Sequence, residues 1–321
     1  IPDTIMSLVY DYDNNANVTS INDEQNSSYS LTNLTYDGLN RLKSTSGGSG
    51  IGSSTITYDG LGNITSYQSK GRSLSYTYDY TTNRLEKVVG VNGRYGSISY
   101  DSRGNIKHNG AYSLSFNAAN QLTTAKGNSY LYDGHNRRVK QINSSGTSYS
   151  MYSKNGTLLY REKGATITGD GINYVHLGKK LIAKYGDLTP RTFEESRQHY
   201  SPFGETIETS TDDVGYTGHK FDNDLGLSYM QARYYDPVIG RFYSNDPVDA
   251  VAHLSNEEGI RGFNRYSYAV NNPYKYTDPD GKAICGGICV IGVGIGVGLL
   301  FDAAIEAIRG DDNSTANTTA N

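Results

Sequence analysis

The sequence contains no tryptophan and only two cysteines, Cys285 and Cys289, in 321 residues. Because these cysteines lie close together near the C-terminal end, they cannot supply a disulfide framework for the rest of the chain. Stability must therefore come from buried side chains and backbone hydrogen bonds. The first residues lack a basic start followed by an apolar run, so no signal peptide is visible, and we expect the chain to begin inside a longer protein.

Several kinds of functional site are also missing from the sequence. The formal net charge of −4, without a cluster of lysines and arginines, argues against binding to nucleic acid. The six histidines are scattered without the paired spacing of metal ligands, and no phosphate-binding loop, nucleophile elbow or Ser-His-Asp pattern occurs. We therefore expect neither a metal nor a cofactor.

Tyrosine and glycine are abundant, with 29 and 37 residues respectively. Tyrosine favours strands, and glycine favours the turns that separate them. The length could hold two average domains, but all-β architectures of this length often form one unit. The composition therefore predicts an all-β fold and leaves the number of domains open.

Tyr-Asp pairs recur between residues 10 and 160, most of them followed by Asn-Arg or Gly-Asn. When the degenerate copies Phe116-Asn117 and Tyr152-Ser153 are counted, successive units start 16 to 24 residues apart, which accommodates two short strands and two turns. Each unit is therefore predicted to be a β-hairpin, and neighbouring hairpins must stack because one hairpin cannot bury its own face. The clearest pairs are Tyr36-Asp37, Tyr58-Asp59, Tyr78-Asp79, Tyr100-Asp101 and Tyr132-Asp133.

The two residues of the pair have separate predicted roles. The tyrosine ends a strand, and the aspartate accepts backbone N–H bonds in the turn, where glycine or asparagine supplies a positive φ. Because tyrosine and aspartate also occur in sugar and metal sites, a ligand site is the alternative interpretation. The regular recurrence favours a structural role, since a binding site needs one constellation whereas a scaffold repeats its turn.

A different pattern fills the stretch from Gly215 to Gly281. Residues 232–247, ARYYDPVIGRFYSNDP, hold two Asp-Pro steps and a Gly-Arg-Phe turn, and NRYSYAVNNPYKYTDPDG follows at residues 264–281. Proline keeps the preceding residue extended and stops helices, so short strands and tight turns are expected. Such a stiff, aromatic segment is suited to closing off a structure rather than extending one.

The order of these motifs resembles the core region that ends the RHS or YD-repeat shell of bacterial polymorphic toxins and insecticidal toxin complexes. The Tyr-Asp units belong to the same pattern, so the resemblance covers residues 10 to 281. It implies an all-β fold with three parts. Stacked hairpins of residues 1–205 spiral into part of a hollow shell, residues 206–281 form a core region that closes it as a plug, and residues 282–321 form a short apolar helix and a tail. The core-motif residues are Arg233, Tyr234, Tyr235, Asp236, Pro237, Gly240, Phe242, Asn272 and Pro273.

The resemblance also implies a reaction. In toxin members, the core region cuts the chain just beyond its DPxG-type motif in the manner of an aspartyl protease, which frees a toxin domain inside the shell. Two carboxylates held close together split their pKa values, so that one serves as acid and the other as base. The matching residues are Asp246 and Asp278 as the catalytic pair, Arg241 and Arg265 as candidate partners of a carboxylate, and Gly281, Lys282 and Ala283 around the cut.

The alternative is that both aspartates cap turns beside proline, the commonest role of Asp-Pro. Three departures from the family pattern favour this alternative. The first motif reads DPVD rather than DPxG, an insertion lies around residues 253–262, and Lys282 stands where an apolar residue, usually leucine, precedes the cut. The sequence therefore leaves both self-cleavage and turn capping open.

The composition changes after Gly281. Residues 283–301 carry no charge over 19 residues, enough to cross a bilayer as a helix, and burial inside a protein shell is the alternative interpretation. Only 40 residues follow Gly281, too few for an ordinary enzymatic toxin, so we expect the toxin itself to be missing or short.

Taken with the resemblance, these features predict the C-terminal part of a secreted or cell-surface bacterial shell protein that encloses and delivers a toxin. Its partners would be its own C-terminal toxin segment, the remaining repeats of the full-length protein, and a secretion apparatus or target-cell surface, but not nucleic acid. Two rival functions remain open. One is an adhesive cell-wall or cell-surface YD-repeat protein that cuts nothing, as in teneurins, and the other is a self-processing protease without further catalysis.

Overall fold

The computed structural model describes residues 7–177, 180–189, 197–247, 264–282 and 297–299. Within these ranges the chain is built of β-strands, and its only helical elements are short 3-10 turns. The prediction of an all-β fold is therefore confirmed. In the same ranges, no helix has the length and hydropathy that a membrane span requires.

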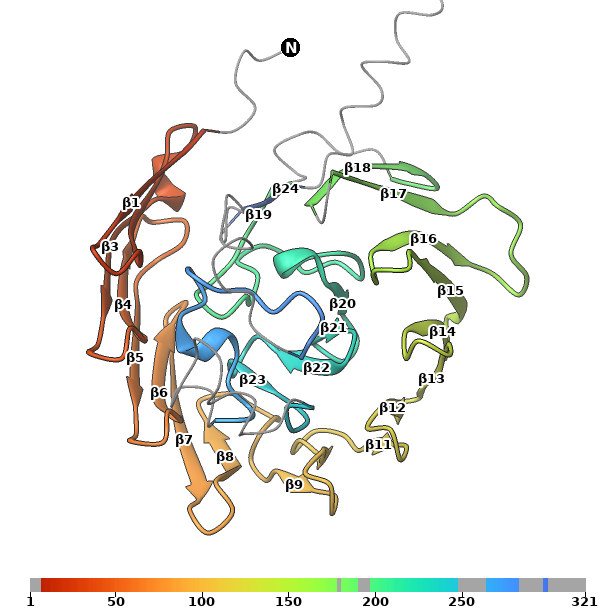
Figure 1. Cartoon of the computed structure of the whole chain (residues 1–321), viewed down its shortest axis with the longest axis horizontal. Coiled ribbons are helices and arrows are strands. Elements are labelled where there is room, and N and C mark those ends of the chain that lie inside the picture. The colour runs from red at the N-terminus through yellow and green to blue at the C-terminus, as the bar shows by residue number, and fades with distance from the viewer. Residues whose placement is uncertain (1–6, 178–179, 190–196, 248–263, 283–296, 300–321) are drawn as a thin grey trace, which may run out of the picture.

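Two eight-stranded antiparallel sheets make up most of the fold, and within each sheet the strands pair in chain order. Figure 1 shows that these sheets, joined through a two-stranded sheet, curve into an open ring, which we call the wall. The wall strands are β1 (Leu8–Tyr12), β2 (Val18–Asp23), β3 (Leu31–Tyr36), β4 (Leu42–Gly47), β5 (Ser54–Tyr58), β6 (Ile64–Ser69), β7 (Arg72–Asp79), β8 (Arg84–Val89), β9 (Ser99–Tyr100), β10 (Ile106–His108), β11 (Leu114–Phe116), β12 (Leu122–Ala125), β13 (Asn128–Tyr132), β14 (Arg138–Asn143), β15 (Gly146–Tyr152), β16 (Leu158–Lys163), β17 (Ile172–Leu177) and β18 (Lys180–Gly186).

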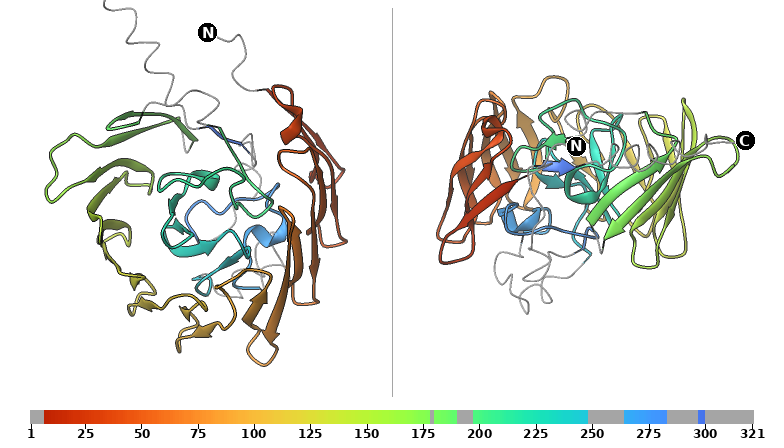
Figure 2. Two further views of the ribbon diagram at one scale, coloured as in Figure 1. Left: turned by 180° about the vertical axis from the view of Figure 1, so that it is seen from behind. Right: turned by 90° about the horizontal axis from the view of Figure 1, so that it is seen from above.

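A four-stranded antiparallel sheet, which we call the inner sheet, lies within the ring (Figure 1; Figure 2, left). The wall curves around it, so segments far apart in the sequence face one another across the interior. The inner-sheet strands are β20 (Lys220–Asp222), β21 (Leu227–Met230), β22 (Arg233–Asp236) and β23 (Arg241–Phe242), and the described 3-10 turns are η1 (Ser27–Tyr29), η2 (Tyr216–Gly218) and η4 (Ala269–Asn271).

The alternation of side chains along each strand determines which face of the wall is buried. In β7, Leu74, Tyr76 and Tyr78 are buried at every second position, and the residues between them are exposed. These buried side chains belong to one hydrophobic cluster with Ile239 and Tyr243 from the core region. The interior face of the wall is therefore covered by the core region rather than by solvent.

Two further strands pair with one another outside these sheets, β19 (Arg197–His199) and β24 (Val297–Leu299). The predicted apolar helix is therefore wrong at residues 297–299. Val297 favours a strand because it is β-branched, and Gly298 is a poor helix former.

Candidate active site

The Tyr-Asp pairs of the wall lie at hairpin turns, and the aspartate organises each turn. Asp59 Oδ1 accepts hydrogen bonds from the backbone N–H groups of Leu61 and Asn63, both at 2.9 Å. Between them Gly62 takes a φ of 79°, so the predicted turn chemistry is confirmed. Asp37, Asp101 and Asp133 accept the same two backbone bonds, whereas Asp79 accepts from Thr81 and Thr82.

The tyrosine of each pair links neighbouring hairpins, a role that the sequence analysis missed. The Tyr58 hydroxyl donates to the carbonyl oxygen of Leu42 at 2.7 Å, and Leu42 begins the return strand of the preceding hairpin. The sequence does carry a signal for this bond. Tyrosine recurs in the repeats rather than phenylalanine, and a buried hydroxyl needs a hydrogen-bond partner. The same bond joins Tyr36 to Val18, Tyr78 to Ile64, Tyr100 to Leu85 and Tyr132 to Leu122.

The two aspartates that the sequence suggested as a pair meet on one arginine. Arg233 of β22 places its Nη1 2.8 Å from Asp246 Oδ2 and its Nη2 2.8 Å from Asp278 Oδ2. All three side chains are buried. The guanidinium also lies over the ring of Phe242, 3.6 Å from its centre, which fixes the arginine from the other side. The result is a buried site in which one guanidinium binds both carboxylates.

The chain that follows the DPDG motif passes directly over this site. Arg233 Nε donates to the carbonyl oxygen of Gly281, and the N–H of Lys282 donates to Asp278 Oδ1 at 3.1 Å. Gly281 has a φ of 72°, and a Cβ there would lie 2.1 Å from the last carbonyl oxygen of β21. Only glycine therefore allows this close approach. Ala283, the last residue of the predicted cleavage site, lies outside the described residues.

The surroundings of Asp278 raise the pKa of its carboxyl. Burial raises the pKa of Asp278 from 3.8 to about 6; Arg233 opposes the rise, and the charges of Asp280 and Asp246 add to it. His219 Nε2 donates to the backbone carbonyl of Asp278 at 2.9 Å and so holds the motif in place. A carboxyl with this pKa can hold a proton at mildly acidic pH, as a general acid must.

The two arginines suggested as carboxylate partners have other contacts. Arg241 donates to the Asn271 side chain and to the Gly62 carbonyl, both at 3.3 Å, so its suggested role is wrong and Arg233 takes it. Arg265 binds the backbone of Asp246 rather than its carboxylate: the Asp246 N–H donates to the Arg265 carbonyl at 3.1 Å, and the Arg265 side chain donates back. The sequence offered one reason to choose Arg233: it lies in an aromatic strand, and an arginine that is buried there needs carboxylates to pair with its charge.

Several other core-motif residues attach the core region to the wall. Asp236 is fully buried and accepts a hydrogen bond from the Tyr95 hydroxyl at 2.7 Å. The side chain of Asn272 donates to Asn17 Oδ1 and to the carbonyl of Asn40, both at 2.8 Å. These contacts join residues more than 140 positions apart, which no local pattern could predict.

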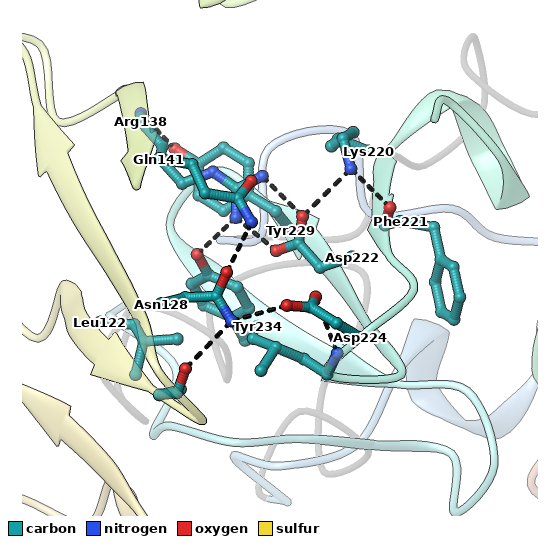
Figure 3. Close-up of polar contacts among 12 residues, drawn as sticks. Leu122, Asn128, Arg138, Gln141, Lys220, Phe221, Asp222, Asp224, Tyr229 and Tyr234 are labelled. Carbon is teal, nitrogen blue, oxygen red and sulfur yellow. Dashed lines mark hydrogen bonds and ion pairs between the residues drawn. The ribbon is translucent and has the colours of Figure 1, made fainter. Parts of the chain in front are cut away.

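A second buried polar cluster joins the wall to the inner sheet (Figure 3). Arg138 of β14 binds the Asp222 carboxylate of β20 through both terminal nitrogens, and it donates to the Tyr234 hydroxyl at 2.8 Å. Lys220 Nζ lies 3.2 Å from the same carboxylate. Although burial opposes ionisation, Arg138 and Lys220 hold the pKa of Asp222 below its ordinary value. Because its charges are paired, we interpret this cluster as a structural link between wall and inner sheet.

Comparison with known proteins connects this architecture to toxin shells. Residues 3–161 match the family described as Teneurin YD-shell. The tRNA nuclease WapA of Bacillus subtilis is 30% identical over 257 residues, which cover 70% of this chain and 11% of that protein. Toxin subunit YenC2 of Yersinia entomophaga is 29% identical over 198 residues, 48% of this chain and 19% of that protein. The chain thus spans about a tenth to a fifth of the length of these relatives.

The fold itself has a counterpart among solved structures. A chain of the Photorhabdus luminescens Tc holotoxin pore superposes with a TM-score of 0.64 at 22% identity. The superposition covers 90% of this chain and 17% of the holotoxin chain. The curved wall with a sheet inside it is therefore an arrangement found in a toxin complex.

Proposed function

The chain belongs to the RHS/YD-repeat family, and from this premise we propose that it closes a toxin shell and cuts itself after the DPDG motif. The wall and core region then enclose a C-terminal toxin segment, and the cut separates that segment from the shell. The remaining repeats of the full-length protein complete the shell, and the protein is secreted or displayed by a bacterium. The observation that carries this proposal is the binding of Asp246, Asp278 and the Gly281 carbonyl by Arg233.

The proposed reaction divides the work between the two aspartates. Asp246, as the carboxylate, takes a proton from a water molecule, whose oxygen attacks the carbonyl carbon of Lys282. Asp278, whose carboxyl has the raised pKa, gives its proton to the nitrogen of Ala283 as the C–N bond breaks. The products are a carboxyl end at Lys282 and an amino end at Ala283. Arg233 does not react; it holds both carboxyl groups and the preceding peptide in place.

Purified chain incubated near pH 6 provides the test, with the intact mass followed over time. Asp246→Asn and Asp278→Asn are each expected to fold and to abolish the cut, because the reaction needs one acid and one base. Lys282→Leu is expected to speed it by restoring the apolar residue that the family has before the cut. Asp187→Asn is the matched control, since it makes the same change at an exposed aspartate beyond β18 and leaves the pair intact.

An intact mass that persists in the parent and in Lys282→Leu would mean that the two aspartates are turn residues. The chain would then serve as a closed scaffold, as in the adhesive cell-surface alternative. Loss of the cut in Asp187→Asn as well would show that the effect of the other two variants is not specific to the pair.

A further inference from the structure

The two members of the aspartate pair are held by different parts of the protein. Asp278 is held from the inner sheet and its flanking turn, by Arg233 and His219. Backbone bonds add to this support, since the Ala232 N–H donates to the carbonyl of Asp280 at 3.1 Å. The position of Asp278 therefore depends on the core region itself.

Asp246, in contrast, lies between residues that contact the wall. Its neighbour Asn245 donates from Nδ2 to the carbonyl of Arg103 at 2.9 Å. The turn opposite Asp246 contains Tyr266, whose hydroxyl donates to the carbonyl of Gly104 at 2.8 Å. Both acceptors belong to one wall turn, the Tyr-Asp turn of residues 101–105, which we call the docking turn.

A second wall turn, that of residues 59–63, binds the same segment. Asn264 donates from Nδ2 to Asn63 Oδ1 at 2.6 Å and to the Leu61 carbonyl at 3.3 Å. The side chains on either side of Arg265, which holds the Asp246 backbone, are thus both bound to the wall. The register of Asp246 relative to Asp278 is consequently set by how the core region sits on two wall turns.

Gly104 makes the closest approach in the docking turn. It has a φ of 87°, and a Cβ added there would lie 2.2 Å from Asn245 Nδ2 and 2.8 Å from the Tyr266 hydroxyl. Any larger residue would push both contacts away. Gly71, in the turn between β6 and β7, has a φ of 69°, yet an added Cβ there would meet nothing within 4 Å.

We propose that the docking turn is a positioning element for the aspartate pair, so that the pair assembles only when the wall has closed around the core region. This inference rests on the proposed self-cleavage and adds its regulation: the bond after Lys282 is cut in a closed shell and stays intact in an open one. Gly104 is a positioning residue and takes no part in the reaction itself.

The test compares Gly104→Ala with Gly71→Ala, which also places alanine at a positive φ but has no steric conflict. Gly104→Ala is expected to slow the cut by on the order of 100-fold, the effect of misplacing a reacting group by about 1 Å. Gly71→Ala should cut at a rate close to that of the parent. Asn245→Ala removes a docking bond from the core side and should also slow the cut, which keeps the test available if Gly104→Ala does not fold.

Hydrogen exchange of the Asp246 amide gives a readout that does not depend on cleavage. Gly104→Ala should make this amide exchange about tenfold faster through local opening, and Gly71→Ala should leave it unchanged. If the parent never cuts, the proposed function fails while this comparison still decides the inference. If the parent cuts and the two glycine variants behave alike in both rate and exchange, the docking turn does not position the pair.

Discussion

Arg233 is the residue on which the candidate site depends, because its guanidinium binds two buried carboxylates and a backbone carbonyl at once. The family motif was enough to predict that Asp246 and Asp278 act together. It was not enough to identify their arginine, since Arg241, Arg265 and Arg233 all lie in the same motifs. The choice among them depends on which side chain of the inner sheet faces the DPDG turn, and that is a property of the folded chain.

Replacing this arginine should destabilise the protein as well as stop the cut. Arg233→Met leaves two buried carboxylates without their cation, a change that costs about 3–5 kcal/mol when a buried ion pair loses one partner. Urea unfolding at neutral pH measures the loss. Arg103→Met is the control: its side chain is 41% exposed, so its cost should stay within about 0.5 kcal/mol. Equal losses in the two variants would contradict the assigned role.

The raised pKa of Asp278 has a consequence for the pH dependence of stability. The folded state binds the Asp278 proton more tightly than the unfolded state. The contribution of this carboxyl to the unfolding free energy is therefore complete below pH 3.8 and is lost as pH rises through about 6. The unfolding free energy of the parent, minus that of Asp278→Asn, should therefore fall by about 3 kcal/mol over this interval. Denaturant unfolding at a series of pH values measures it, and a flat or rising difference would contradict the assignment.

Asp79, in a wall turn, should show the opposite pH dependence of stability. Hydrogen bonds from Thr81 and Thr82 lower the pKa of Asp79 to about 2. Its contribution to stability is therefore present above pH 3.8 and is lost as pH falls towards 2. The difference between the parent and Asp79→Asn should accordingly change in the opposite direction and at lower pH.

Hairpins are the elements that the sequence predicted best, because their turn chemistry is local. The aspartate, its two backbone bonds and the residue with positive φ all lie within five positions of one another. The link from each tyrosine to the preceding hairpin spans 10 to 18 residues and depends on how hairpins stack, so it was missed. Strand β19 could not be predicted from its own residues because its pairing partner, β24, is distant in sequence.

Substitutions at Tyr78 separate packing from the hydroxyl bond. Tyr78→Ala should cost about 3–5 kcal/mol, since the buried ring leaves a cavity. Tyr78→Phe keeps the ring and loses the bond to the Ile64 carbonyl, and should cost about 1 kcal/mol. Tyr80, 64% exposed, supplies the control, and Tyr80→Ala should stay within about 0.5 kcal/mol in the same denaturant titration. A loss at Tyr80 matching that at Tyr78 would mean that the wall faces are assigned incorrectly.

At the scale of the whole molecule, the arrangement of wall and core region followed from the family resemblance and not from local patterns. Stacking of the repeats predicts a sheet, but the curvature that brings Asn17 to Asn272 has no signature in either segment. Buried links such as that between Arg138 and Asp222 fix the core region inside the ring. Such a link requires two charged residues 84 positions apart, and single-sequence reasoning cannot pair them.

The central claim is that Asp246 and Asp278 cut the chain between Lys282 and Ala283, and the masses and new ends of the products test it most directly. The account predicts a fragment that ends at Lys282 and a 39-residue fragment that begins at Ala283, both absent from Asp246→Asn and Asp278→Asn. Fragments with other ends, or a single intact chain in both the parent and Lys282→Leu, would contradict it.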